Sequence, residues 1–159
     1  MTRVWLIDGP SGSGKTTYAT ALGQRRGHRV VHLDDFYPGW SGLAAGARMV
    51  SECVLHPSAP GYRRWDWERD RPGEWVALPV GEPLIIEGVG AITQASVAAA
   101  RRLGEVRTVW VDAPEAVRRA RALARDPYYE PWWEMWASQE REHFRAIANM
   151  DVDERVDNG

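Results

Sequence analysis

The chain has 159 residues, 44% of them hydrophobic, and a formal net charge of −2 from 20 basic and 22 acidic side chains. This size predicts one domain, residues 1–159, with a single core. The mixed charge argues against nucleic-acid or membrane partners, and the lone Cys53 excludes an internal disulfide. With no apolar run of membrane-spanning length and no signal-peptide pattern, we expect a cytoplasmic protein. The oligomeric state is left open.

Strand-like apolar runs alternate with helical patterns along the chain. This alternation is typical of βαβ units, so it predicts an α/β fold with about five parallel strands and helices on both faces of the sheet. The stretch 56–81, rich in Pro, Gly, Trp and Arg, is irregular. The expected strands are 3–8, 28–34, 83–88, 106–113 and, more weakly, 152–156, and the expected helices are 15–26, 42–55, 94–103, 114–126 and 131–149.

The first connection reads GPSGSGKT from Gly9 to Thr16, which matches the phosphate-binding pattern G-x-x-x-x-G-K-[ST]. Glycines let successive backbone N–H groups converge on one anion, and the following helix adds a favourable dipole. Lys15, the only lysine in the chain, can reach the β- and γ-phosphates, and the Thr16 hydroxyl can bind Mg²⁺. The pattern predicts a P-loop NTPase sandwich of three layers. The residues expected to hold ATP are Gly9, Ser11, Gly12, Ser13, Gly14, Lys15, Thr16 and Thr17.

Carboxylates follow the second and third expected strands, at the sheet edge where α/β proteins bind ligands. Asp34 and Asp35 end the second strand, and Glu87 follows a buried run. Adjacent strand residues point to opposite sides, so only one of the two aspartates can face the phosphate loop. Glu87 stands where an acid that organises Mg²⁺ belongs; the alternative is an acid that meets solvent at the strand end.

Arginines recur on the expected helix 114–126. Arg118, Arg121 and Arg125 follow an i, i+3, i+7 spacing and therefore share one face. Bidentate donors can stabilise the charge spread over a transferring phosphoryl group, so the row predicts a phosphoryl clamp in a lid around 114–130. A solvated charged face is the simpler alternative.

Tryptophans are numerous, nine in all. Trp132, Trp133 and Trp136 fit an apolar helical stripe, which favours core packing over a wall that stacks on substrate. Trp65 and Trp67 bracket Asp66 in an expected loop, where ligand stacking and loop anchoring are equally compatible with the pattern.

In their order, GPSGSGKTT, LDDFY, YRRWDW, IIEGVGA, VRRARALARD and VDERVDN resemble the uridine kinase-like branch of the P-loop small-molecule kinases over most of the chain. The resemblance implies that Asp34 is the base that deprotonates the acceptor hydroxyl. It also implies that the three arginines belong to the lid. The implied substrate-binding residues are Asp34, Tyr37, Tyr62, Trp65 and Asp66.

We therefore expect an ATP- and Mg²⁺-dependent kinase that phosphorylates a hydroxyl of a small, nucleoside-like molecule. Lys15, Asp34 and the lid arginines would carry catalysis, and Thr16 and Glu87 would hold the metal. The alternative is an NTP-binding or ATPase protein that acts through a protein partner, and unstimulated ATP hydrolysis would favour it. A GTPase is disfavoured, because the guanine-reading N-K-x-D motif needs a second lysine.

Overall fold

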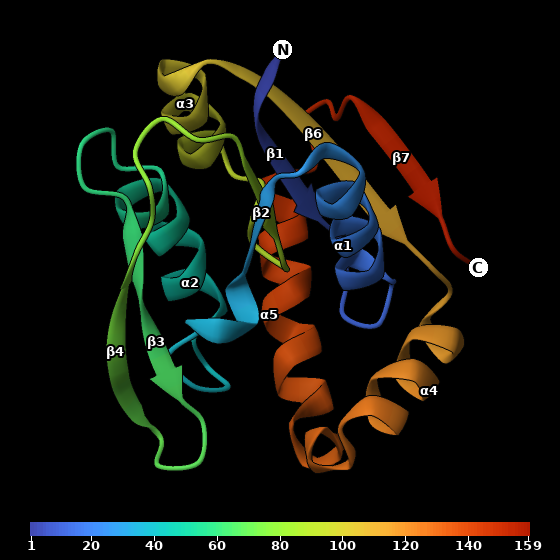
Figure 1. The fold of residues 1–159 in the computed structure, drawn as a ribbon. Coiled ribbons are helices and arrows are strands. Elements are labelled where there is room, and N and C mark those ends of the chain that lie inside the picture. Colours follow the sequence, from blue (N-terminus) through green and yellow to red (C-terminus); the bar gives the residue numbers. More distant parts are fainter.

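The computed structural model describes all 159 residues, and a five-stranded sheet with the strand order β2-β5-β1-β6-β7 forms its centre. Every neighbouring pair of strands in this sheet is parallel, as the alternation of patterns predicts. The structure thus confirms the predicted α/β architecture (Figure 1). The strands are β1 (Thr2–Asp8), β2 (Arg29–His32), β5 (Leu84–Glu87), β6 (Glu105–Asp112) and β7 (Glu154–Asp157).

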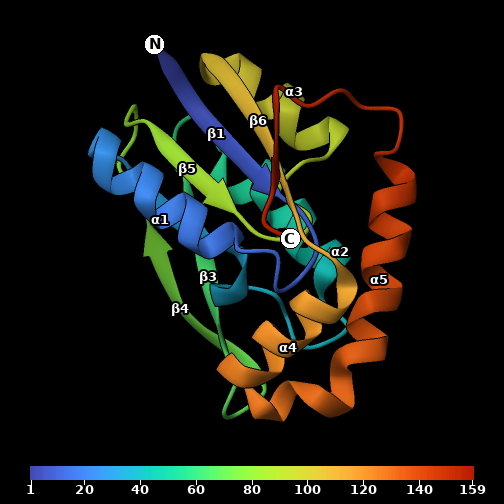
Figure 2. The same cartoon turned by 90° about the vertical axis from the view of Figure 1, so that its right-hand side faces the viewer.

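Helices cover both faces of the sheet, with α1 on one side and α5 on the other (Figure 2). Side chains alternate along β1: Trp5 and Ile7 pack in the cluster under α1, whereas Val4 and Leu6 belong to the larger core on the opposite face. A sheet covered on both faces requires apolar residues on both, which explains the nearly unbroken apolar runs. The helices are α1 (Lys15–Arg26), α2 (Leu43–Met49), α3 (Gln94–Leu103), α4 (Glu115–Arg125) and α5 (Trp133–Ala146).

Several element ends differ from the sequence prediction. β2 stops at His32, and Leu33–Asp35 forms a 3₁₀ turn because the amides of Phe36 and Tyr37 both donate to the Leu33 carbonyl. The expected helix 42–55 is α2 followed by a π-helical turn, Val50–Val54. The expected helix 131–149 starts with a 3₁₀ segment, Pro127–Trp132, and becomes α-helical from Trp133.

The stretch 56–81, expected to be irregular, contains an antiparallel hairpin of β3 (Gly61–Asp66) and β4 (Arg71–Ala77). The hairpin stands beside α2, across from α4, at the end of the molecule where β1 and β6 finish (Figure 1). Asp70, the only non-glycine residue with a positive φ, of 51°, lies in its turn. No helix is long and apolar enough to cross a membrane.

Candidate active site

The glycine-rich loop connects the carboxyl end of β1 to the first turn of α1. Gly12 has a φ of 78°, and a Cβ there would lie 2.2 Å from the carbonyl oxygen of Arg118 in α4. Gly14 has a φ of 98° and immediately precedes α1. Glycine is therefore required at Gly12 both for its backbone conformation and for the close approach of α4.

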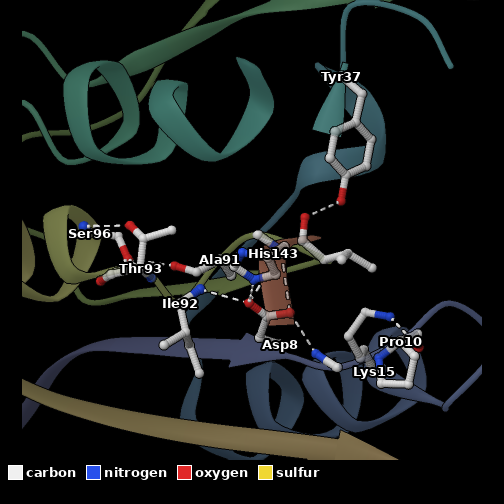
Figure 3. A network of polar contacts seen from close by, with 12 residues as sticks. Asp8, Pro10, Lys15, Tyr37, Ala91, Ile92, Thr93, Ser96 and His143 are labelled. Atoms are coloured by element: carbon white, nitrogen blue, oxygen red, sulfur yellow. Dashed lines mark hydrogen bonds and ion pairs between the residues drawn. The ribbon is translucent and has the colours of Figure 1, made fainter. Parts of the chain in front are cut away.

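A polar cleft, here called the phosphate-side cavity, opens beside this loop. Lys15 lines it although only 8% of the residue is exposed, and its Nζ donates to the Pro10 carbonyl at 2.9 Å (Figure 3). Gly9 and Ser13 do not line the cavity, and the buried Ser13 hydroxyl has no hydrogen-bond partner. The predicted ATP-binding residues that line the cavity are Ser11, Gly12, Gly14, Lys15, Thr16 and Thr17.

Thr16 and Glu87, the predicted metal residues, meet in this cavity. The Thr16 hydroxyl lies 3.2 and 3.3 Å from the two carboxylate oxygens of Glu87, which is only 2% exposed. No group of three or more His, Cys, Asp or Glu side chains could hold a metal. One hydroxyl and one carboxylate nevertheless fit Mg²⁺, which takes most of its ligands from phosphates and water in nucleotide sites.

His32 contacts the same carboxylate. Its Nδ1 lies 3.0 Å from a Glu87 oxygen, and this hydrogen bond raises the pKa of His32 against the opposing effect of burial. His32, Glu87 and Thr16 therefore form a connected polar group.

Asp34 and Asp35 lie in the 3₁₀ turn after β2, not in the strand itself. A 3₁₀ turn has about three residues per turn, so the side chains of adjacent residues diverge there, as they would in a strand. Asp34 lines the phosphate-side cavity, whereas Asp35 does not and lies 3.8 Å from Arg64. Solvent reaches Asp34 through the cleft, but protein atoms surround its carboxylate on the other sides. Loss of hydration is the main cause that raises the pKa of Asp34, the negative charge of Glu87 is the second, and the positive charge of Lys15 lowers it.

The three predicted lid arginines have different partners. Arg118 donates from Nε to the Ala113 carbonyl at 2.9 Å and from Nη1 to the Ser11 carbonyl at 3.4 Å. Arg121 donates to the carbonyl of Asn158, near the C-terminus, at 2.8 Å. Only Arg125 lines the phosphate-side cavity.

A second, larger space, here called the aromatic cavity, has a volume of about 580 Å³. It shares Ser11, Asp34, Tyr37, Arg125 and Trp136 with the phosphate-side cavity, so the two cavities adjoin along a common wall. Its aromatic lining residues are Tyr37, Trp40, Trp67, Tyr128, Tyr129, Trp132 and Trp136.

The tryptophans differ in whether they pack in the core, line the aromatic cavity or anchor a loop. Trp133 and Trp136 are buried at 3% and 5% exposure, whereas Trp132 is 40% exposed and lines the aromatic cavity. Trp67 lines the cavity and also anchors its loop, because its Nε1 donates to the Asp34 carbonyl at 2.9 Å. Trp65 lines neither cavity, and its buried indole N–H has no partner.

Of the other predicted substrate-binding residues, only some line a cavity. Tyr37 lines both cavities, and its hydroxyl donates to the Val89 carbonyl at 2.7 Å (Figure 3). Tyr62 packs against Phe36 in the core, with ring centroids 5.0 Å apart. Asp66 caps the hairpin turn by accepting from Arg69, which lowers its pKa. Neither Tyr62 nor Asp66 lines the phosphate-side cavity or the aromatic cavity.

Sequence reasoning missed a buried acid at the end of β1. The Asp8 carboxylate accepts from the amides of Gly9, Gly90 and Ile92 at 2.7, 3.2 and 2.9 Å (Figure 3). It also lies 2.8 Å from Nε2 of His143 in α5. Asp8 therefore joins the phosphate loop, the loop after β5 and α5.

A second missed acid lies one turn before His143 on α5. The Glu140 carboxylate accepts from the Ser11 amide of the phosphate loop at 2.8 Å, and burial raises its pKa. Glu140 and His143 continue the buried stripe of Trp133 and Trp136. Polar residues in an apolar helical stripe were the signal that could have identified them.

Comparisons with known proteins identify solved structures that have a similar fold. No family model matches the chain, and no curated protein matches its sequence. The structure is similar to that of a possible uridine kinase from Bacillus stearothermophilus, with a TM-score of 0.58 at 22% identity over 98% of this chain and 89% of the other.

Two further solved structures are similar to this chain. A gluconokinase from Sinorhizobium meliloti matches with a TM-score of 0.59 at 15% identity, over 98% of this chain and 82% of the other. A sugar kinase from a Janibacter species matches with a TM-score of 0.58 at 20% identity, over 99% and 86%. The resemblance to uridine kinases stated from the sequence is confirmed at the level of the fold.

Proposed function

We propose that the protein is an ATP-dependent kinase that transfers the γ-phosphoryl group of ATP to a hydroxyl of a small, nucleoside-like molecule. The observation that carries this proposal is that the two cavities adjoin at Asp34 and Arg125, which line both. One cavity is lined by the phosphate loop and the other has the size and apolar lining of a small-molecule site. The kinase neighbours support the same class of reaction.

The phosphate loop would hold the nucleotide. Backbone amides from Gly12 to Thr17, with the α1 N-terminus behind them, offer donors and a favourable dipole to the phosphates. Lys15 would exchange its bond to the Pro10 carbonyl for a phosphate oxygen. Thr16 and Glu87 would hold Mg²⁺, which neutralises phosphate charge when it is bound with ATP.

Asp34 would act as the general base. Its position at the boundary of the cavities would put its carboxylate between the acceptor hydroxyl and the γ-phosphate. The raised pKa of Asp34 makes it a better proton acceptor than an ordinary aspartate, because a stronger base gains more from taking the hydroxyl proton. Arg125 would stabilise charge on the transferring group, and Arg118 would keep α4 against the loop.

The chain would then work as one kinase domain, residues 1–159, with a lid at 114–130. Lid closure over the two cavities would exclude water and so favour transfer to the acceptor over hydrolysis. Positioning and electrostatics would supply the catalysis, and no covalent enzyme intermediate is required.

The test is ADP release from ATP and Mg²⁺ with a panel of nucleosides, sugars and amino alcohols. We expect release to depend on an acceptor. Asp34→Asn should keep ATP binding and lower transfer by about 10²- to 10⁴-fold, the range for loss of a general base. Asp35→Asn is the comparison variant and should lower transfer much less, because Asp35 lines only the aromatic cavity, where it pairs with Arg64, and does not line the phosphate-side cavity.

Two further results would separate the alternatives. Lys15→Ala should abolish ATP binding or turnover while the circular dichroism spectrum stays unchanged. Hydrolysis that needs no acceptor and is indifferent to Asp34→Asn would instead support an ATPase that works through a protein partner.

A further inference from the structure

The aromatic cavity is built around one indole ring. The Trp40 centroid lies 4.9 Å from Tyr129 and 5.2 Å from Trp67. Trp132 is stacked at 5.9 Å with only 7° between the ring planes, and Trp136 meets Trp40 edge-on at 6.3 Å. Fixed ring faces of this kind attract flat molecules and organic cations, because the face of an aromatic ring is its negative side.

The charged groups of this cavity are unbalanced. Asp34, Asp35, Glu68 and Asp126 line it, and Arg125 is the only basic side chain among the lining residues. Arg125 also lines the phosphate-side cavity, where the phosphates of ATP would engage it. An acceptor in this cavity would therefore be surrounded by carboxylates whose negative charge few basic side chains neutralise.

Partners outside the cavity compensate only part of this charge. Asp35 lies 3.8 Å from Arg64, and Asp34 is assigned to the reaction itself. Glu68 is exposed and Asp126 half-buried, and neither forms an ion pair. A cleft lined mainly by one sign of charge raises the local concentration of the opposite charge. A sugar acid would be repelled here, whereas a cation would be attracted by carboxylates and rings together.

We infer that the phosphoryl acceptor is an organic cation, a hydroxyl compound with a quaternary ammonium group or a positively charged ring. The cation lies among the rings of the aromatic cavity, near Glu68 and Asp126, and its hydroxyl reaches Asp34. This assignment rests on the proposed kinase function for the transfer step. The binding of the cation itself follows from the cavity alone.

The experiment compares three pairs that differ mainly in charge: choline with 3,3-dimethylbutan-1-ol, 1-methyladenosine with adenosine, and 3-methylcytidine with cytidine. Binding is measured by calorimetry with a non-hydrolysable ATP analogue present, and transfer is measured separately with ATP. We expect the cation of at least one pair to bind ten times more tightly than its neutral partner, or more. We expect the same cation to be phosphorylated preferentially.

Matched variants locate the preference. Trp132→Leu removes a ring of the cavity that is 40% exposed, and Trp75→Leu removes a ring of β4 outside it that is 45% exposed. Likewise Glu68→Gln removes a charge of the cavity, and Glu52→Gln removes an exposed charge outside it that, like Glu68, forms no ion pair. Trp132→Leu and Glu68→Gln should reduce the preference for the cation at least threefold, and the two outside variants should leave it unchanged.

The outcomes separate the two proposals. Equal or tighter binding of the neutral compounds, or no binding of any of the three cations at millimolar concentration, overturns the cation assignment. Phosphorylation of a neutral acceptor alone does the same while it supports the kinase. Tight binding of a cation without transfer to any acceptor supports the cation site and removes the kinase function.

Discussion

The buried carboxylate of Asp8 offers the sharpest test of how the site is held together. Four donors converge on it: the amides of Gly9, Gly90 and Ile92, and Nε2 of His143. One carboxylate oxygen accepts from the Gly9 amide, and the other accepts from the Ile92 amide and from Nε2 of His143. The Asp8→Asn variant keeps the shape of the side chain but has only one acceptor oxygen, so at least one amide must lose its partner.

The expected cost follows from the burial of this group. Asp8 and Ile92 are both 0% exposed, so water cannot replace the lost hydrogen bond. A buried donor without a partner costs about 1–3 kcal/mol, and bonds to a charged acceptor lie at the upper end of this range. We therefore expect Asp8→Asn to lower the free energy of unfolding by about 2–3 kcal/mol. In a chain of this size that corresponds to a fall in Tm of roughly 4–12 °C.

The measurement is urea unfolding followed by circular dichroism, together with calorimetry for Tm. Asp112→Asn is the matched control. Like Asp8, Asp112 ends a central strand, and its carboxylate accepts from the next amide, that of Ala113. Asp112 is exposed, however, so water can replace any hydrogen bond that the substitution removes. The control should change stability by less than about 0.5 kcal/mol. A stable Asp8→Asn protein, or an equal loss in both variants, would refute this account of the network.

Three further predictions concern the site itself. Gly12→Ala should weaken ATP binding at least tenfold without unfolding the protein, as titration calorimetry can show, because the added Cβ would force the loop away from α4. Arg125→Ala should lower kcat by about 10²-fold or more while Arg121→Ala stays within about threefold, because only Arg125 lines the cavity. The stability that protonated His32 gains from Glu87 should be fully present below about pH 6.5, the ordinary pKa, and disappear as pH rises through the raised folded value. Urea unfolding from pH 5 to pH 9 should therefore show a stability difference between wild type and His32→Gln that shrinks with rising pH.

Signals that depend on neighbouring residues predicted most of the fold. The alternation of apolar runs and helical patterns identified every strand of the parallel sheet. The inner strands β1 and β5 are largely apolar because both faces are covered, whereas the edge strand β7 is half exposed and gave the weakest signal. The glycine pattern from Gly9 to Thr16 placed the phosphate loop correctly between β1 and α1. Element ends were less predictable: the apolar run through Leu33 gave no sign that the chain would leave β2 at His32 and form the 3₁₀ turn Leu33–Asp35.

The hairpin of β3 and β4 shows why the irregular stretch misled the sequence reading. β4 is mostly exposed and contains Pro72 and Gly73, and β3 contains the adjacent arginines Arg63 and Arg64, so neither the two-residue alternation nor a continuous apolar run marks these strands. The hairpin also decides which of its residues reach the site. Asp66 is retained in the turn by Arg69, whereas Trp67 and Glu68 extend into the aromatic cavity.

Acceptor recognition could not be inferred from local sequence, because the wall of the aromatic cavity comes from segments far apart in the chain. Trp40 precedes α2, Trp67 follows β3, and Trp132 ends the 3₁₀ segment before α5. Each of these tryptophans is compatible with ordinary packing when its own neighbours alone are considered. Only the fold brings the rings of Trp67 and Trp132 within 6 Å of that of Trp40 and beside the carboxylates of the cavity. The residues proposed for the reaction thus lie in segments that the local sequence identifies, the loop and the strand ends, whereas the proposed acceptor cavity depends on how the hairpin and the segment after α4 approach each other.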